Sequence, residues 1–390
     1  MYLKVENEQQ LGDCLEILYQ QTLISFDLEF DRDRHTYGFD LCLLQIGFQD
    51  SSFIIDPLSI EDLGPLYDFF EDPAILKLVH CPGEDLRLLH SLDCYPQNVA
   101  DTEVMAKLLN YEQTSLAKLL EGKCGIVLNK KQQQSNWHNR PLLPEQLTYA
   151  ADDVLYLPQL YNILLEEIKE KNLNDWVAEE NNWLQTVRYT LEPKTNFLKP
   201  GDTKNLSPWH AYVMNEVFLL RDRIAERKNK PAYMIMPEDS VRGIALDILD
   251  YSNPTAVSGL HPSLRHGNDA DDFKEQIEAI FDKADDKKLN KKTQREWINN
   301  EEFEKQMERK RTQYHLKDDF FAPIQKTMVA ELGTYAARYI LSNGWISKWL
   351  NAEVKWNDLQ PAYKRDFIKT VLTGLGLTFN EVLQYEKTYH

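Results

Sequence analysis

The sequence has few cysteines, no long apolar run and no excess of positive charge. Its five cysteines (Cys14, Cys42, Cys81, Cys94 and Cys124) are odd in number and never spaced as CxxC. This argues against a disulfide framework and a structural zinc site, and it fits a reducing cytoplasm. No segment approaches the roughly 18 apolar residues of a membrane helix, and the first residues lack the apolar stretch of a signal peptide. We therefore expect a cytoplasmic protein without membrane contact.

Negative charge is concentrated in one half of the chain. The 390 residues carry a formal charge of −18, from 44 basic and 62 acidic side chains. Residues 1–195 hold 15 basic and 33 acidic residues, whereas residues 196–390 hold 29 of each. Proteins that bind nucleic acid usually present basic surfaces, so the net charge alone argues against such a partner. Its location, however, indicates two halves with different roles.

The first half alternates strand-like and helix-like segments. Residues 23–30 alternate apolar and polar with period two, and residues 41–46 and 52–55 are short apolar runs. Further apolar runs at 76–80 and 98–101 alternate with helical patterns. Three adjacent strands followed by strand–helix alternation predict a mixed sheet flanked by helices.

The second half has helical patterns throughout. Ser207-Pro208 is typical of a helix N-cap followed by proline at the first helical position. Helices are expected near 239–249 and 271–281, and the charged stretch 283–317 is either an exposed helix or a linker. Aromatic and aliphatic residues return from Phe320 onward and predict another helical unit.

Two acids lie in the most apolar predicted strand. Asp27 and Glu29 are two residues apart and project from one face, opposite the apolar side chains of Ile24, Phe26, Leu28 and Phe30. The simplest interpretation is a pair of solvated acids at a strand end. The alternative is a divalent-cation site, because Mg²⁺ prefers carboxylate oxygens and two such ions clamp the reacting oxygens of a phosphodiester.

Three further residues favour the cation site. Asp85 follows Pro82-Gly83 in a predicted first helical turn beside a strand end, although an acid there also stabilises a helix N-terminus. Tyr149 and Asp153 are four residues apart, which puts a phenol and a carboxylate on one helix face. An amphipathic helix with a surface acid would give the same spacing.

Together these residues resemble the DEDD family of 3′→5′ exonucleases, in the subclass with a tyrosine in the last motif. The first motif is similar to Asp27-Leu-Glu29, the second to His80-x-x-x-x-Asp85 and the third to Tyr149-x-x-x-Asp153. Asp101-Thr102 and Trp137-x-x-Arg140-Pro-Leu142 extend the similarity toward ribonuclease D. The resemblance implies a ribonuclease-H-like α/β exonuclease domain, in which a mixed sheet is flanked by helices.

The second half resembles an HRDC domain, the small helical nucleic-acid-binding module that follows the nuclease domain in ribonuclease D. The matching segments are Leu219–Ala225, Asn229-Lys-Pro231 and Ile235–Ala245. The implied organisation is a 3′→5′ exonuclease domain at 1–190, a linker at 191–206, an all-α HRDC domain at 207–285, a charged helical linker at 286–319 and a C-terminal helical domain at 320–390. A second HRDC-like unit is one interpretation of the last segment.

The resemblance also implies two divalent cations, Mg²⁺ or Mn²⁺. Asp27 would bridge them, Glu29 and Asp153 would complete one site, and Asp85 would hold the other. Tyr149 would orient the attacking water rather than act as a strong base, because an unperturbed phenol has a pKa near 10. Each cycle would release one nucleoside 5′-monophosphate.

Several residues are candidates for substrate contacts. Phe30 could stack on a terminal base, although core packing is the simpler interpretation. Phosphate contacts are expected from the loop before the third motif and from the helical half, with a solvated surface as the alternative in both places. The candidates are Lys130, Lys131, Gln134 and Arg140 in the loop, and Arg221, Arg227 and Lys230 in the helical half.

The leading hypothesis is a monomeric exoribonuclease that trims tRNA precursors and other structured RNAs at single-stranded 3′ ends. A 3′→5′ DNA exonuclease is an alternative, because the same metal site cuts either polymer and recognition of the 2′-OH separates them. A catalytically inactive nucleic-acid-binding scaffold is a third hypothesis. The complete Asp/Glu/Asp/Tyr/Asp set argues against it.

Overall fold

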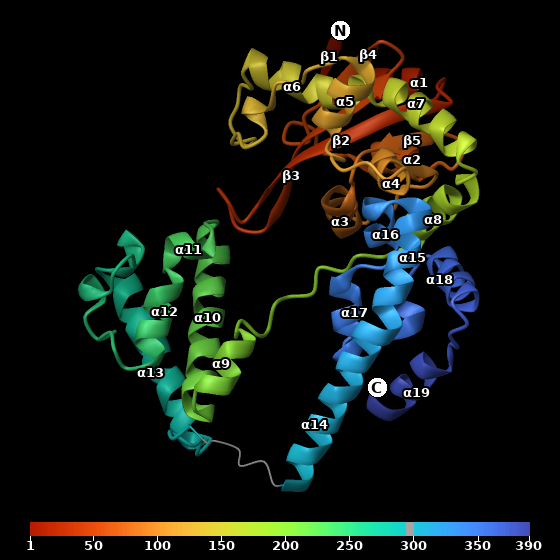
Figure 1. Ribbon diagram of the computed structural model, residues 1–390. Helices are drawn as coiled ribbons and strands as arrows, with labels where there is room; N and C mark the ends of the chain where they lie inside the picture. The colour runs from red at the N-terminus through yellow and green to blue at the C-terminus, as the bar shows by residue number, and fades with distance from the viewer. Residues whose placement is uncertain (294–299) are drawn as a thin grey trace. The chain divides into compact units, whose positions relative to one another are not determined.

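The computed structural model describes residues 1–293 and 300–390, which form two compact units (Figure 1). The first unit holds Met1–Glu29, Leu41–Thr190 and the described chain from residue 300 onward. The second holds Phe30–Asp40 and the described chain from Leu191 to residue 293. Residues 294–299, which fall in the predicted charged linker 286–319, lie outside the described residues.

A six-stranded mixed sheet forms the centre of the first unit, with the strand order β1-β4-β3-β2-β5-β6. The pairs β1·β4, β2·β5 and β5·β6 are parallel, whereas β3·β4 is antiparallel. The strands are β1 (Tyr2–Val5), β2 (Leu23–Arg32), β3 (Phe39–Phe48), β4 (Ser51–Ile55), β5 (Leu76–Val79) and β6 (Val99–Asp101).

Helices flank this sheet, as the alternating pattern predicts. They are α1 (Glu8–Leu18), α2 (Gly64–Glu71), α3 (Gly83–Ser91), α4 (Thr102–Leu108), α5 (Leu116–Cys124), α6 (Pro144–Leu155), α7 (Leu157–Glu170) and α8 (Asn174–Thr186). The predicted mixed sheet flanked by helices is therefore confirmed. The sequence pattern missed β1, because this strand has only four residues and gains its stability from pairing with β4.

The C-terminal helices belong to the first unit. They are α14 (Asn300–His315), α15 (Ala322–Leu332), α16 (Thr334–Ile340), α17 (Asn343–Leu350), α18 (Ala362–Gly374) and α19 (Asn380–Tyr389). No residue of α14 is buried, so this part of the charged stretch is an exposed helix rather than an extended linker.

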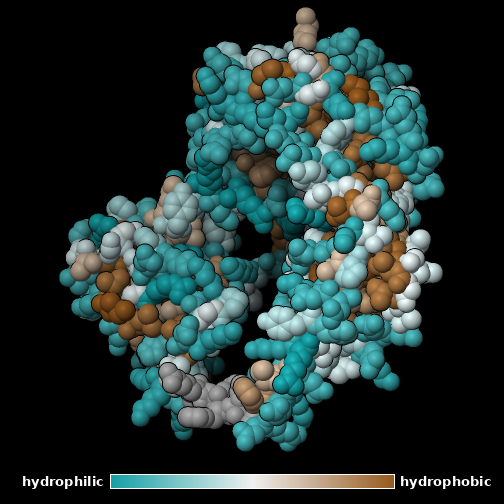
Figure 2. Space-filling model, in the orientation of Figure 1, coloured by the Kyte–Doolittle hydropathy of each residue, from teal (hydrophilic) through white to brown (hydrophobic). Residues whose placement is uncertain are grey.

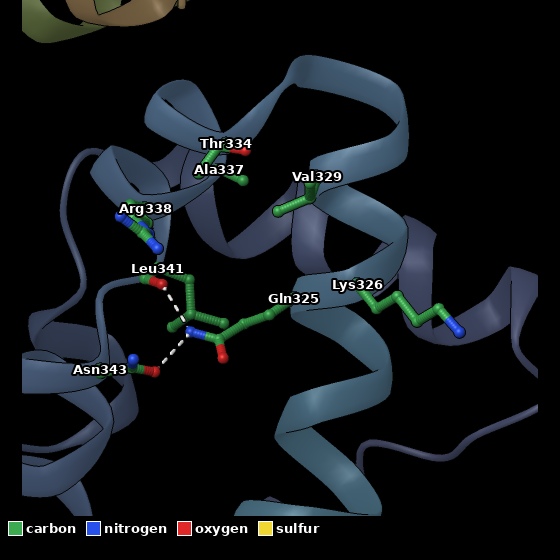
Figure 3. Close-up of a pocket in the computed structure, with 8 residues that line it drawn as sticks. All are labelled: Gln325, Lys326, Val329, Thr334, Ala337, Arg338, Leu341 and Asn343. Carbon is green, nitrogen blue, oxygen red and sulfur yellow. Dashed lines mark hydrogen bonds between the residues drawn. The ribbon is translucent and has the colours of Figure 1, made fainter. Parts of the chain in front are cut away.

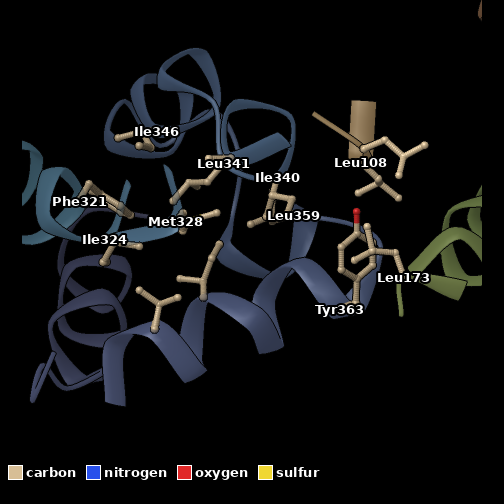
Figure 4. Close-up of a cluster of buried hydrophobic side chains, with 14 of the residues drawn as sticks. Leu108, Leu173, Phe321, Ile324, Met328, Ile340, Leu341, Ile346, Leu359 and Tyr363 are labelled. Atoms are coloured by element: carbon tan, nitrogen blue, oxygen red, sulfur yellow. The ribbon is translucent and has the colours of Figure 1, made fainter. Parts of the chain in front are cut away.

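One hydrophobic cluster joins α15–α19 to α4, α5, α7 and α8. In Figure 4, Tyr363 of α18 lies beside Leu108 of α4 and Leu173 at the start of α8. Across the same interface, the side-chain oxygen of Asn110 accepts hydrogen bonds from the backbone of Tyr335 (2.7 Å) and Ala336 (3.2 Å) in α16. The segment predicted as a C-terminal domain at 320–390 thus shares its core with the sheet-bearing region.

The helical part of the second unit is built around α10. Its helices are α9 (Pro200–Asn205), α10 (Pro208–Lys228), α11 (Ala232–Ile235), α12 (Glu238–Ala245) and α13 (Asn268–Asp286). Ser207 caps α10 as predicted, because its hydroxyl accepts a hydrogen bond from His210 N at 3.2 Å. The hairpin loop between β2 and β3 contacts this helical part within the same unit, which the sequence pattern did not indicate. The assignment of 207–285 as an HRDC domain stays a prediction.

Hydrophilic side chains cover most of the face seen in Figure 2, with apolar side chains scattered among them. The most exposed apolar residues include Val127 (79%) and Ile248 (72%), which lie far apart in the chain. Within the described residues, every helix is too short or too polar to cross a membrane.

Candidate active site

Strand β2 places Asp27 and Glu29 at the centre of the sheet, between β3 and β5. Its apolar residues Ile24, Phe26 and Leu28 are buried in the core, as their alternation predicts. Glu29 is only 8% exposed and Asp27 is half-buried. The two acids therefore do not form the solvated pair of the simpler interpretation.

Helix α6 crosses this strand at very short range. The hydroxyl of Ser25 in β2 donates a hydrogen bond to Val154 O of α6 at 2.6 Å. Gly47 in β3 makes the approach possible, because a Cβ atom there would lie 2.4 Å from Ser25 Oγ and 2.9 Å from Val154 O. The residue next to Val154 is Asp153, so this contact positions the last acid over Asp27 and Glu29.

The result is a compact cluster of carboxylates. One oxygen from each of Asp27, Glu29 and Asp153 lies within 4.8 Å of the others. Asp85 contributes a fourth charge, which raises the pKa values of Asp27 and Glu29. The structure thus brings together the four acids that the three sequence motifs single out.

A tight turn between β5 and α3 places Asp85 near the carboxylate cluster. Cys81 adopts the left-handed conformation in this turn, with φ of 57°. Its backbone N–H donates to the carboxylate of Asp101 at 3.0 Å, and the same carboxylate caps α4 by accepting from Glu103 N at 2.8 Å. Asp101 therefore connects the end of β6 to the turn, which explains why Asp101-Thr102 accompanies the acidic motifs.

Burial among like charges raises the pKa of every carboxylate in the cluster. Burial is the largest cause in each case; the charge of Asp85 adds to it for Asp27, and the charges of the other three acids add to it for Glu29. Burial raises the pKa of Asp85 to about 7, with the charges of Glu84 and Asp101 adding to it. Burial and then the charge of Asp27 raise the pKa of Asp153 to about 8. Partly or fully buried acids with no base among the converging ligands are costly when ionised, so the site is electrostatically suited to a cation.

Tyr149 lies on α6 one turn before Asp153, as the spacing predicts. Its hydroxyl hydrogen-bonds the Asp153 carboxylate. Burial and then the neighbouring carboxylates raise the pKa of Tyr149 well above its usual value, so the phenol stays protonated and acts as a donor. The buried ring of Trp137 supports it, with the ring centres 6.1 Å apart.

The donor set fits a hard divalent cation. The cluster offers only carboxylate oxygens, without a thiolate or an imidazole among the three converging ligands. Oxygen-only sets select Mg²⁺, Mn²⁺ or Ca²⁺ over zinc or copper. Asp27, Glu29 and Asp153 would hold such an ion, and the charge of Asp85 acts on Asp27 and Glu29.

A cavity of about 420 Å³ opens onto this cluster. Asp27, Tyr149 and Asp153 line it together with His80, Cys81, Glu103, Thr114, Ser115, Leu116, Ala117, Leu128, Lys130, Gln133 and Leu157. Of the two predicted lysines, Lys130 therefore reaches the cavity. Lys131 and Gln134 are exposed and absent from its lining, where Gln133 takes the place expected for Gln134.

Arg140 uses its guanidinium for hydrogen bonds within the protein. Its Nε and one terminal nitrogen bind both oxygens of Asp56 at 2.5 and 2.7 Å, and its remaining hydrogen bonds go to the backbone oxygens of Cys42, Trp137 and Asn139. These five bonds use all five donors of a guanidinium. They argue against the predicted contact between Arg140 and a phosphate, and they join the Trp137–Leu142 motif to β3 and to the residue that follows β4.

The other predicted substrate residues all belong to the second unit. Phe30 is half-buried and packs edge-on against Phe39 with ring centres 5.1 Å apart, in line with its simpler interpretation. In α10, Arg227 faces Asp272 of α13 at 3.9 Å, and Lys230 is exposed just after the helix. Arg221 is partly buried beneath the ring of Phe218. Substrate contacts by these residues stay predictions.

A second cavity, of about 370 Å³, lies among the C-terminal helices (Figure 3). Gln325 Nε2 spans it and donates to Leu341 O at 3.1 Å and to Asn343 Oδ1 at 3.0 Å. Its described lining has no acid, histidine or cysteine, so it offers no carboxylate, imidazole or thiolate to a metal ion.

Sequence reasoning missed two residues that position the acids. Ser25 and Gly47 hold α6 in place, yet each is an ordinary strand residue in the sequence. Asp101 belongs to the resemblance, but its hydrogen bond to the β5–α3 turn comes from the structure alone. His80, the first residue of the second motif, has its Nδ1 2.9 Å from Thr102 Oγ1 and lines the cavity. A small residue facing a serine on the neighbouring strand is the one signal that could have indicated the close approach of α6.

Comparisons with known proteins agree with this geometry. A family model described as "3'-5' exonuclease" matches residues 2–169. Ribonuclease D of Gluconacetobacter diazotrophicus is 30% identical over 247 residues, which cover 62% of each chain. Ribonuclease D of Desulfotalea psychrophila is 32% identical over 252 residues, covering 62% of this chain and 67% of the relative. The match thus spans about three fifths of the first relative's length and two thirds of the second's.

A solved structure extends the likeness to nearly the whole chain. The crystal structure of Escherichia coli RNase D matches with a TM-score of 0.69 over 96% of this chain and 99% of the other. At 20% identity this likeness concerns the fold alone, namely the exonuclease domain followed by a largely helical region. On the evidence of the sequence relatives and the sheet-borne carboxylates together, the chain belongs to the ribonuclease D family.

Proposed function

We propose that this protein is a metal-dependent 3′→5′ exoribonuclease that releases nucleoside 5′-monophosphates and trims the 3′ ends of tRNA precursors and other structured RNAs. The observation that carries the proposal is the convergence of Asp27, Glu29 and Asp153 within 4.8 Å in a buried site. Membership of the ribonuclease D family supports RNA as the substrate.

Each residue of the site has a distinct role in this proposal. Asp27, Glu29, Asp85 and Asp153 hold two divalent cations, Mg²⁺ or Mn²⁺. Such cations, when bound, lower the pKa of water and offset the negative charge that builds on the phosphate. The protonated Tyr149 hydroxyl orients the attacking water, and its hydrogen bond to Asp153 sets its direction. Lys130, at the cavity wall, contacts the phosphate of the terminal nucleotide.

A 5′-labelled tRNA precursor with a single-stranded 3′ extension tests this function. With Mg²⁺ or Mn²⁺ the label should move down a ladder in single-nucleotide steps, and EDTA should stop the reaction. A DNA oligomer of the same sequence measures the preference for RNA. Release of no nucleotide with either metal would favour the inactive scaffold, and equal degradation of DNA would favour a general 3′→5′ exonuclease.

A further inference from the structure

Gln45 of β3 is a buried glutamine whose side-chain amide has no hydrogen-bond partner within the described residues. Its relative exposure is 0%, and both the Nε2 donor and the Oε1 acceptor are unpaired in this part of the chain. An exposed amide would bind water instead. Because a buried and unpaired polar group opposes folding, its presence calls for a specific reason.

The position of Gln45 follows from the contact between β2 and β3. Only residues 33–38 connect these two neighbouring strands, which is too short for a crossover, so the strands run antiparallel. A Cβ atom on Gly47 would lie 2.4 Å from Ser25 Oγ, so these two residues are neighbours on the face covered by α6. Two residues nearer the hairpin on each strand, and on the same face, are Asp27 and Gln45. Gln45 is therefore the β3 residue beside Asp27.

The surroundings of Gln45 on this face are mainly apolar. Leu43, two residues along β3, is 0% exposed and belongs to one apolar cluster with Ala150 and Ala151 of α6. Ile54, the partner of Gln45 on β4, belongs to the same cluster. A leucine or methionine in place of Gln45 would suit this environment without leaving a donor or an acceptor unpaired. The amide therefore does not serve the packing of α6 on the sheet.

A neutral donor beside Asp27 does have a use in a cation site. An ionised carboxylate can accept about four bonds, and a bound cation takes up only part of that capacity. An amide N–H can hold a remaining lone pair without cancelling the negative charge that attracts the cation, as a lysine would. Such hydrogen bonds fix the orientation of metal-binding carboxylates. Asp27 lines the cavity at the carboxylates and Gln45 does not, so the amide could support this acid without touching a substrate.

Building on the proposed function, we propose that Gln45 is a positioning residue of the cation site, whose Nε2 donates a hydrogen bond to the Asp27 carboxylate when that carboxylate holds a cation. Neighbours on adjacent strands have Cβ atoms about 4.5–5.5 Å apart, a distance that a glutamine side chain spans by rotation about its own bonds. The amide makes no hydrogen bond within the described residues, so no other contact has to break for this rotation.

Cation binding without catalysis tests this role. Electron paramagnetic resonance of unbound Mn²⁺ measures the affinity of the full-length protein for Mn²⁺ in the absence of RNA. Gln45→Met keeps the length of the side chain but removes its polar atoms, and it should weaken Mn²⁺ binding about tenfold. In EDTA the same variant should melt at the wild-type temperature or above it, because an unpaired buried amide is lost.

Nucleotide release gives a second measurement of the same effect. Gln45→Met should need about tenfold more Mg²⁺ for a half-maximal rate, whereas kcat at saturating Mg²⁺ should stay close to that of the wild type. Gln45→Leu, which copies the neighbouring Leu43, should behave in the same way if the methionine disturbs the packing. An unchanged requirement for Mg²⁺ and an unchanged affinity for Mn²⁺ would overturn the proposal.

Ser52→Ala is the matched control. Ser52 is 1% exposed, and its Oγ also has no partner in the described chain. It pairs with Gly47 and lies on β4, so β3 separates it from β2 and Asp27. Its loss should leave the affinity for Mn²⁺ unchanged. Equal weakening by Ser52→Ala and Gln45→Met would overturn the proposal in favour of a general disturbance of the sheet. A lower melting temperature of Gln45→Met in EDTA would overturn it as well, because the amide would then have a partner without the cation.

Asp27→Asn separates this inference from the proposed function. The expected result is a graded loss of Mn²⁺ binding, severe in Asp27→Asn and about tenfold in Gln45→Met. If Asp27→Asn loses the binding and Gln45→Met keeps it in full, the Gln45 proposal fails alone. If Asp27→Asn binds Mn²⁺ as the wild type does, the carboxylates do not hold the cation, and the proposed function fails together with this inference.

Discussion

The two charged regions of this protein differ in how their charges are paired. At the carboxylate site four acids lie together with no basic partner among the converging groups, and their pKa values are raised. In the helical unit, acids and bases mostly neutralise one another, as in Lys228–Asp269 at 2.8 Å and Arg242–Asp202 at 2.7 Å. Paired charges need no ligand, whereas buried like charges favour one of opposite sign. The arrangement of charge, more than its net value, therefore indicates where a ligand binds.

The largest expected effect removes one acid from the cluster. Asp153→Asn should lower the rate of nucleotide release by roughly a thousandfold or more, because the proposed metal ligand loses its negative charge. Single-turnover release of 5′-mononucleotides measures it, with circular dichroism to check folding. The control is Asp152→Asn, the adjacent acid on the same helix, whose rate should stay within a few-fold of wild type. Equal losses in both variants would contradict the assignment of Asp153.

A buried ion pair tests how much a paired charge contributes to stability. Lys364 of α18 lies 2.9 Å from Glu180 of α8, and both side chains are less than a tenth exposed. Lys364→Met would leave Glu180 as an uncompensated buried charge, so we expect a loss of about 3–5 kcal/mol in the free energy of unfolding. Lys369→Met breaks an exposed pair with Asp366 and should cost less than about 1 kcal/mol. Urea unfolding compares the two variants. Similar unfolding midpoints would mean that the ion pair between Lys364 and Glu180 does not hold the C-terminal helices in place.

The close approach of α6 can be tested without touching a charge. Gly47→Ala introduces a Cβ atom 2.4 Å from Ser25 Oγ, so α6 must shift and carry Asp153 away from Asp27. We expect about 1–3 kcal/mol of destabilisation and at least a tenfold lower rate of nucleotide release. Gly12→Ala in α1 has open space around its new atom and should leave the rate unchanged. A fully active Gly47→Ala protein would show that α6 is not positioned by this contact.

The smallest expected effect is a pH dependence of stability in EDTA. Asp85 and Asp153 have pKa values of about 7 and about 8 in the folded protein, above those of an unfolded chain. As pH rises from about 4, the unfolded chain ionises first, so the contribution of these groups to stability declines and is lost once the pH passes about 8. Thermal melts in EDTA between about pH 5 and about pH 8 should show a falling Tm, with a shallower fall in Asp153→Asn. Millimolar Mg²⁺ should raise the Tm most at the alkaline end, and a flat profile would contradict the unpaired cluster.

Local sequence patterns sufficed for the elements that carry the acids. The period-two alternation of β2 predicted the buried face of Ile24, Phe26 and Leu28, and the four-residue spacing placed Tyr149 and Asp153 on one helix face. Such patterns work because one side of each element is buried and the backbone period decides which residues face it.

Long-range contacts were out of reach of the same patterns. Nothing near Arg140 in the sequence indicates that its guanidinium forms an ion pair with Asp56. Likewise, nothing within 320–390 indicates that Tyr363 packs with Leu108 and Leu173. Both contacts join residues more than 80 positions apart. Local sequence periodicity therefore cannot predict them.

By itself the sequence determined the mixed α/β domain, the helical second half and the five residues of the acidic motifs, because these depend on local period and on side-chain chemistry. The tertiary structure decided which charges are left unpaired. It converged Asp27, Glu29 and Asp153 on one buried point, paired Arg140 with Asp56, and set Tyr37 of the hairpin against α10. The free energy of a charge depends on its burial and its neighbours, and both are properties of the folded chain.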